Sequence, residues 1–370
     1  MEKKWITEMD IARGLSISFV VLIHTLNIPI MNSKPPSVSY WGFNLLQAFI
    51  QFAVPCFILI SSIMVSYHLK SDQIKLLPFY QKKLVKMVVP YLLWTAIFLA
   101  FQVLLNKIPL SSLLSVKHWL FWLFCGKAYT HLYFMSIIIQ FYLLAPLLVK
   151  LVYATRTSLS LTLLINMSIQ VGIYWVNKLY IYPVFPYPAT LFIWYWCIST
   201  LGLWIGFNYA KWTTYINKYW PYILACFIAL TSIYLYYKVQ ILSKVKFNTF
   251  YYQMTWYVFV ILASILILHL SLKLDLLQNK MAKALTWVGE LSFGIYMIHP
   301  LLTLLLSRII KFSNPMLLSI LTLVMTVGII GFCGFIVILL QGNKVTSILF
   351  GRYKKINRSS SSSTSIKGEL

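Results

Sequence analysis

The chain has 370 residues, of which 60% are hydrophobic and only 10% are charged. A soluble globular domain is about 45–50% apolar and about 25% charged, so this composition excludes an ordinary soluble enzyme, a disordered chain and a disulfide-rich secreted scaffold. Lys and Arg number 31 against seven Asp and Glu, which gives a formal net charge of +24. In so apolar a chain we expect the basic residues to orient the protein in a membrane and to contact its lipids, and we expect no nucleic acid partner.

Apolar runs of about 20 residues, the length that crosses the hydrocarbon core of a bilayer, recur along the chain. They predict an all-α, polytopic integral membrane protein with about ten transmembrane helices, joined by short connections into one domain over residues 1–345. A β-barrel would instead show alternating segments of about ten residues. The predicted spans are residues 12–30, 42–67, 84–105, 132–153, 159–177, 191–210, 220–237, 255–273, 288–310 and 316–340.

The distribution of basic residues predicts the orientation of these spans. An even number of spans places both ends of the chain on one side. About two thirds of the lysines and arginines fall in the segments that are cytoplasmic when the N-terminus is cytoplasmic, so the positive-inside rule favours both ends inside. The last residues, 346–370, are basic and then serine-rich, and we expect a disordered cytoplasmic tail. The five cysteines are scattered, and their spacing predicts no metal site.

The first predicted span carries three ionisable residues, Asp10, Arg13 and His24. Asp10 and Arg13 are three residues apart on a helix and are therefore able to pair. Arg13 and His24 share a face, but about 16 Å of helix axis separates them at 1.5 Å per residue. Arg13 is either a topology anchor or part of a binding site. His24 either makes an interhelical hydrogen bond or is a buried neutral imidazole, the usual general base near neutral pH.

Two further patterns lie on the next two spans. Pro55 interrupts the second span, where it either kinks the helix or frees backbone groups that line a cavity. Lys83 and Lys86 are three residues apart at the predicted cytoplasmic edge of the third span. They either belong to the general excess of positive charge inside, or form with Arg13 a cationic mouth that captures a phosphate-bearing cytoplasmic donor.

Polar residues also interrupt two later spans. His131 and Tyr133 open the fourth span at its predicted outer end, where Tyr133 suits an aromatic belt and His131 is able to face an outer substrate. In the ninth span, Ser292, Tyr296 and His299 are spaced to form one polar stripe. Such a stripe is costly in lipid, so we expect it to face protein or water.

Together these patterns resemble the membrane acyltransferase-3 superfamily over essentially all of the predicted spans. The matching elements are Asp10-x-x-Arg13-Gly14 with His24, Val54-Pro55-x-Phe57 with Ser61, Lys83-x-x-Lys86 and residues 293–300. The chain departs from the family pattern where Ser62 replaces a glycine and where lysines replace a common arginine pair, which implies looser contacts to phosphate. The branch to which the chain is most similar is associated with poly-N-acetylglucosamine, as exporter or as O-succinyltransferase.

The resemblance implies an enzyme of the cell membrane that needs no bound cofactor. Such an enzyme moves an acyl group, acetyl or succinyl, from cytoplasmic acyl-CoA to a hydroxyl of a cell-surface polysaccharide. Membrane lipids, acyl-CoA, the glycan and polysaccharide-synthesis proteins are the expected partners. The expected site residues are His24, as general base, with Tyr296 and His299 for catalysis, Asp10, Arg13, Lys83 and Lys86 for the donor, and His131 and Tyr133 for the acceptor.

Two alternatives come from different classes of protein. A glycan exporter without chemistry would keep the aromatic residues, which stack on sugars, but would not need the spacing between Arg13 and His24. A structural subunit of a polysaccharide-synthesis complex would tolerate the replacement of His24 by asparagine. The spacing of Arg13 and His24 therefore favours the enzyme.

Overall fold

The computed structural model describes residues 6–69, 74–310, 314–340 and 348–350, and these residues form helices and connections without a strand. The α-helices are α1 (Thr7–Thr25), α2 (Asn27–Asn32), α3 (Val38–Phe49), α4 (Ala53–Ser66), α5 (Leu76–Lys83), α6 (Val85–Leu104), α7 (Val116–Cys125), α8 (Tyr133–Thr155), α9 (Leu159–Val176), α10 (Trp196–Phe207), α11 (Tyr209–Leu242), α12 (Thr249–Leu277), α13 (Lys280–Glu290), α14 (Ser292–Ile309) and α15 (Pro315–Leu339). Single turns of 3₁₀ or π helix join some of them, among them η1 (Ile50–Phe52), η3 (Asn177–Ile181) and η5 (Phe192–Tyr195).

Within the described residues, nine helical segments are long and apolar enough to cross a membrane. They coincide with nine of the ten predicted spans, which confirms an all-α polytopic membrane protein. The sixth predicted span, 191–210, forms a shorter apolar helix over Phe192–Phe207. The sixth predicted element is thus present but shorter than expected, and most of α10 is buried against α4, α8 and α9.

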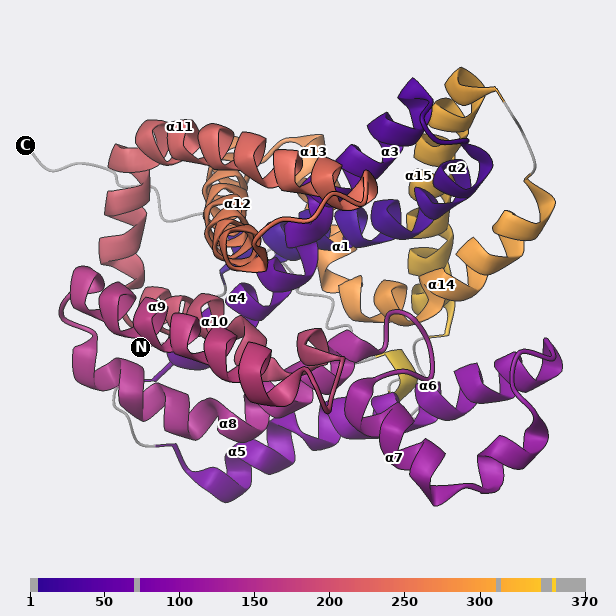
Figure 1. The fold of residues 1–370 in the computed structure, drawn as a ribbon. Coiled ribbons are helices and arrows are strands. Elements are labelled where there is room, and N and C mark those ends of the chain that lie inside the picture. Colours follow the sequence, from indigo (N-terminus) through magenta and orange to yellow (C-terminus); the bar gives the residue numbers. More distant parts are fainter. Residues whose placement is uncertain (1–5, 70–73, 311–313, 341–347, 351–370) are drawn as a thin grey trace, which may run out of the picture.

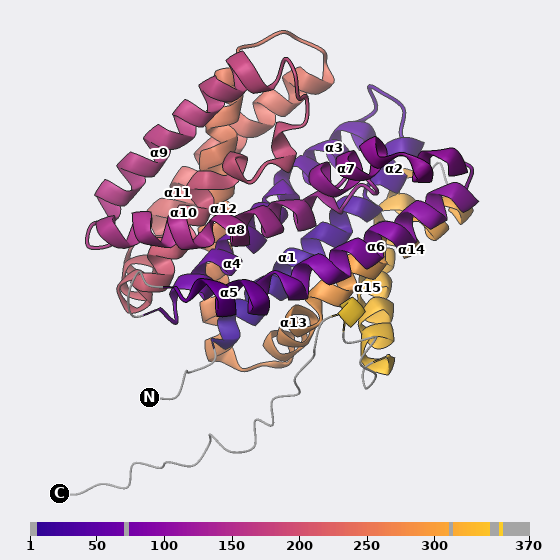
Figure 2. The ribbon, with the colours of Figure 1, turned by 90° about the horizontal axis from the view of Figure 1, so that it is seen from below.

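The helices surround α1, which contacts α4, α12, α13, α14 and α15. Both ribbon views show α9, α11 and α12 on one side of the molecule and α14 and α15 on the other, with α1 between them (Figures 1 and 2). α11 is a long peripheral helix with few buried residues, whereas more than half of the α1 residues are buried. The first helix of the chain is therefore the core of the bundle.

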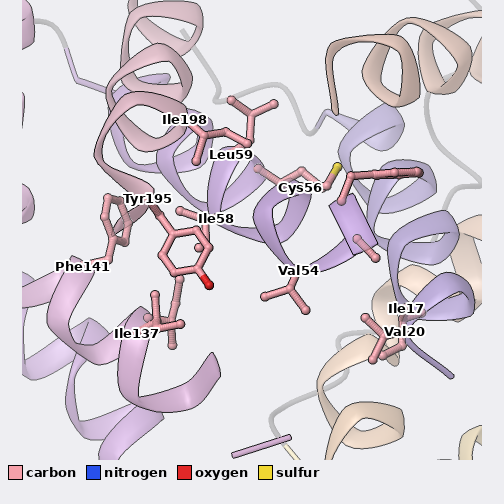
Figure 3. Packing of buried hydrophobic residues seen from close by; sticks show 14 of the residues in the cluster. Ile17, Val20, Val54, Cys56, Ile58, Leu59, Ile137, Phe141, Tyr195 and Ile198 are labelled. Carbon is pink, nitrogen blue, oxygen red and sulfur yellow. The ribbon is translucent and has the colours of Figure 1, made fainter. Parts of the chain in front are cut away.

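The packing between α1, α4 and α8 is apolar and continuous. Ile17 and Val20 of α1 face the side chains of α4, and Ile137 of α8 lies on the opposite side of α4 beside Tyr195 (Figure 3). The Tyr195 hydroxyl points towards the space next to Val54 in the same view. These side chains are nearly inaccessible to solvent, so they fix α1, α4 and α8 relative to one another.

Two glycines allow α1 and α13 to cross closely. A Cβ atom added to Gly14 would overlap the backbone oxygen of Leu285, and one added to Gly289 would overlap the backbone oxygen of Asp10. Small residues at such a crossing let two backbones approach and pack without lipid between them. The glycine that follows Arg13 in the first-span motif is therefore required by packing.

The tail expected at residues 346–370 falls almost entirely outside the described residues. Its described part, 348–350, packs against α6: the Trp94 indole nitrogen donates to the Leu349 carbonyl at 3.0 Å, and the rings of Trp94 and Phe350 lie 5.9 Å apart. The start of the expected tail is thus held on the bundle.

The crossing of α1 and α13 generates a stability prediction. Replacing Gly14 by alanine forces the two backbones apart, and we expect it to lower the free energy of unfolding by about 1–3 kcal/mol, the usual cost of overpacking. The measurement is the thermal unfolding of the purified protein in detergent. Gly172→Ala in α9 is the control, because a Cβ there meets nothing within 4 Å. Equal melting temperatures for both variants would contradict the close crossing.

Candidate active site

Three imidazoles and one phenol, from three separate parts of the chain, meet at one point. His24 comes from the last turn of α1, Tyr296 and His299 come from α14, and His131 comes from the segment before α8. The ring centroids of His24 and His299 are 5.1 Å apart, those of His131 and His299 5.8 Å, and those of His131 and Tyr296 5.2 Å. We call these four residues the histidine cluster.

Hydrogen bonds within the histidine cluster settle which atoms are free for chemistry. The Tyr296 hydroxyl donates to the backbone carbonyl of His131. His299 Nδ1 lies 3.0 Å from the Ile295 carbonyl oxygen. Because a carbonyl only accepts, the proton of the neutral ring is on Nδ1 and the lone pair is on Nε2. That Nε2 is buried and has no hydrogen-bond partner among the described residues, so it remains available as an acceptor.

His131 is fully enclosed, and both of its ring nitrogens lack a hydrogen-bond partner within the described part of the chain. His131 precedes α8 and lies outside the helical segments that are long enough to cross a membrane. Burial lowers the pKa of His131, and the neighbouring His299 and His24 lower it further. The ring is therefore neutral at physiological pH. Buried polar atoms without partners are rare in folded proteins, so the two nitrogens of His131 are able to bind a ligand that enters the site.

The histidine cluster borders a cavity of about 340 Å³, the central cavity. His24, His131 and Tyr296 line it, together with Tyr133 and Pro55. The second predicted span is interrupted here by η1, and α4 begins two residues before Pro55. Of the two interpretations of Pro55, a simple kink or a break that lines a cavity, the structure contains the cavity. A site of this volume lies near the lower end of the range for small-molecule pockets, about 300–1,000 Å³.

His24 also lines a second cavity of about 170 Å³, on the side of the cluster where α1 continues into α2. This second cavity includes Asn27, Tyr129 and Thr303, none of which borders the central cavity. The His24 side chain, which is only partly buried, thus contacts two separate spaces. An imidazole in this position is accessible to two different molecules.

The other end of α1 carries a group of charges. Arg13 Nη1 and Asp10 Oδ1 form an ion pair at 2.6 Å, which confirms the predicted pairing, and Asp10 is buried. Lys83 is half-buried, lies close enough to Arg13 for their charges to repel, and has its Nζ 5.5 Å from the centre of the Tyr142 ring. We call Asp10, Arg13 and Lys83 the basic cluster.

Lys86 lies apart from this group. Leu84, the one residue between α5 and α6, has α-helical backbone angles, so both lysines lie on one nearly continuous helical segment. Lys86 is exposed, whereas Lys83 is half-buried. It remains within the range of charge repulsion from Lys83. The expected lysine pair is therefore divided into an inner and an outer positive charge.

The structure brings together all the residues for which catalytic or acceptor roles were expected, since His24, His131, Tyr133, Tyr296 and His299 meet at the central cavity or beside it. Sequence reasoning missed three further residues that line it, Gln51, Tyr195 and Trp256. Gln51 had a usable signal, an amide in an apolar stretch just before Pro55 and one helical turn after Gln47. The two aromatic residues had none, because they resemble the aromatics of a membrane interface.

The proximity of three histidines does not amount to a metal centre. Among residues 6–69, 74–310, 314–340 and 348–350, no three His, Cys, Asp or Glu side chains are placed to hold a metal ion. The imidazoles lie tilted or edge-on to one another, with ring centroids more than 5 Å apart. The nitrogens without a partner among the described residues, both of His131 and Nε2 of His299, are available for proton transfer and hydrogen bonding.

The bond from Tyr296 to His131 can be tested by removing one oxygen. We expect Tyr296→Phe to lower the free energy of unfolding by about 1 kcal/mol, because the His131 carbonyl loses one of its two donors and keeps only the Phe134 N–H. The readout is again thermal unfolding in detergent. Tyr133→Phe is the matched control for stability, since the structure gives its hydroxyl no partner among the described residues. A Tyr296→Phe melting temperature equal to that of Tyr133→Phe would count against the bond.

A comparison with protein-family models identifies the chain. The acyltransferase-3 model, described as an acyltransferase domain, matches residues 6–337. No curated protein and no solved structure gave a match. The family match covers nearly the whole helical bundle, and it includes every residue of the histidine cluster and of the basic cluster. The chain therefore belongs to the acyltransferase-3 family and is a membrane enzyme that transfers acyl groups.

Proposed function

We propose that the protein is an O-acyltransferase of the cell membrane. It takes an acyl group, acetyl or succinyl, from cytoplasmic acyl-CoA and transfers it to a hydroxyl of a cell-surface polysaccharide or its precursor, in the poly-N-acetylglucosamine-like branch of the family. The observation that carries this proposal is the position of His24. One helix holds this imidazole between two cavities and holds the basic cluster about three turns away.

The reaction assigns one proton to His24. As the acceptor hydroxyl attacks the thioester carbon, a C–O bond forms and the C–S bond breaks. His24 takes the hydroxyl proton as general base and returns it to the CoA thiolate that leaves. His299, whose ring centroid lies 5.1 Å from that of His24, acts with it as an acceptor through Nε2, and Tyr296 holds His131 in place.

The basic cluster is the proposed donor site. Arg13, Lys83 and Lys86 supply positive charge for the phosphates of CoA, and the buried Asp10 carboxylate orients the Arg13 guanidinium. Charge-assisted contacts of this kind are stronger than neutral hydrogen bonds. The proposed orientation places this end of α1 in the cytoplasm.

The glycan exporter is the less favoured alternative. An exporter has no need of an imidazole with a free lone pair, nor of an ion pair at a fixed distance from it. Membership of a family of acyltransferases weighs against it as well. The acceptor still comes from the same chemical class under both proposals, so sugar binding alone does not separate them, whereas acyl transfer does.

Removing the base should abolish transfer without removing the donor site. We expect His24→Ala to lower kcat about 10²–10⁴-fold, the range for loss of a general base, with acyl-CoA affinity unchanged. The measurement is the transfer of radiolabelled acetyl or succinyl groups by the protein in nanodiscs. His118→Ala on exposed α7 is the control and should retain full activity. Full transfer by a well-inserted His24→Ala protein would refute the mechanism.

Removing the positive charges should weaken donor binding. We expect Lys83→Ala/Lys86→Ala to weaken acyl-CoA binding about ten- to a hundredfold, since hydrogen bonds to charged groups are worth about 1.5–3 kcal/mol. Titration calorimetry with acetyl-CoA, succinyl-CoA and free CoA at low and high salt gives the affinities. The pair Lys107→Ala/Lys117→Ala, two exposed lysines, is the control. Unchanged CoA affinity in the first double variant would place the donor elsewhere.

A further inference from the structure

The central cavity has an uncharged lining. The residues that border it include aromatic rings, aliphatic side chains, imidazoles and one amide, but no Lys, Arg, Asp or Glu. Transfer of an ionised group from water into such a place is costly unless an opposite charge meets it. The occupant that this lining tolerates is therefore neutral.

The same lining suits a ring with one apolar face and several hydroxyl groups. Tyr195 and Trp256 border the cavity, and their rings lie 6.2 Å apart at 68° to each other, so together they form two walls of a corner. The Tyr195 hydroxyl donates to the Ala189 carbonyl at 3.1 Å, so it is already engaged. Aromatic walls of this kind supply contact area but few hydrogen bonds, which leaves the polar contacts to other residues.

Gln51 is the amide that is able to serve this task, beside the imidazole of His131 and the hydroxyl of Tyr133 in the same lining. It lies in η1, at the break between α3 and α4, and borders the cavity. Its Oε1 accepts a hydrogen bond at 3.0 Å from the Tyr234 hydroxyl. The Nε2 group, which carries two donors, has no hydrogen-bond partner among the described residues. One side of the amide is therefore fixed, and the other is free for a ligand.

Tyr234 reaches the site from the periphery. It belongs to α11, where only four residues are buried, and its own side chain is completely enclosed. The ring stacks on Phe259 with centroids 4.6 Å apart, which holds the hydroxyl beside Gln51. A buried tyrosine hydroxyl requires a partner, and here the partner is a side chain of the central cavity.

We propose that the central cavity binds one uncharged pyranose ring of the acceptor, and that Gln51 selects it. The amide donates from Nε2 to a hydroxyl or acetamido oxygen of the ring, the ring packs against Tyr195 and Trp256, and Tyr234 is a positioning residue that holds the amide. The acceptor hydroxyl then lies beside His24, which borders the same cavity. This inference rests on the proposed function, because it names the class of sugar that the enzyme acylates.

The first experiment measures sugar binding without an acyl donor. Full-length protein in nanodiscs is titrated with neutral tetrasaccharides of glucose and of N-acetylglucosamine, and with charged tetrasaccharides of glucosamine and of galacturonic acid. We expect a neutral tetrasaccharide to bind at least about tenfold more tightly than either charged one. Equal or tighter binding of a charged sugar, or no binding of either neutral sugar, would overturn the proposal.

Three variants then test the role of the amide. Gln51→Met keeps the size of the side chain and removes its donors, and we expect it to weaken binding of the neutral sugar about tenfold. Tyr234→Phe keeps Gln51 but removes the hydrogen bond that holds its amide. We expect this variant to bind the neutral sugar about three- to tenfold more weakly. Tyr236→Phe, two residues further along α11 and exposed, is the control and should bind as the unaltered protein does.

Acyl-CoA affinity separates positioning from general damage. A loosened fold would weaken both ligands, whereas a misplaced Gln51 weakens only the sugar, with a higher KM for the acceptor at unchanged kcat. Sugar binding that survives Gln51→Met unchanged refutes the role of the amide. Selective, Gln51-dependent binding of a neutral sugar without any acyl transfer would retain this site and refute the proposed enzyme function instead.

Discussion

One helix fixes the distance between the two ends of the site. α1 is in contact with α4, α12, α13, α14 and α15, and such enclosure leaves a helix little freedom to bend or slide. Its rise of 1.5 Å per residue keeps the basic cluster about 16 Å from His24. Enclosure also limits what α1 is able to contain, since an unpaired charge in its middle would be prohibitively costly. The ionisable residues therefore lie near its two ends, with Asp10 and Arg13 paired.

This rigidity suits a reaction between two molecules that never share a compartment. A thioester that arrives from one side and a hydroxyl that arrives from the other meet only at a point that both are able to reach. His24 has this property, because it borders one cavity with Tyr296 and another with Thr303. His131 beside it is a neutral ring, and no Lys or Arg of the described residues lines the central cavity that His24 borders.

Much of the fold could be predicted from the sequence, because the bilayer restricts a spanning chain to helices of a certain length and apolarity. The pair Asp10–Arg13 was predictable for the same kind of reason, as it depends on helical spacing alone. The meeting of His131 with His299 was not, since 168 positions of chain separate them and no periodicity relates two different helices. Nor could spacing show that α5 ends at Lys83, or that an amide before Pro55 is held by a tyrosine of α11.

The short helix α10 has a consequence for how the protein is made. Phe192–Phe207 spans about 24 Å at the helical rise, less than the roughly 30 Å of the hydrocarbon core. Gly202 and Gly206 lie directly against the backbone of α4, so α10 is shaped to pack on protein. During synthesis α4 emerges from the ribosome first, and α10 then has a surface on which to settle. The protein surface on which α10 packs is therefore synthesised before α10 itself.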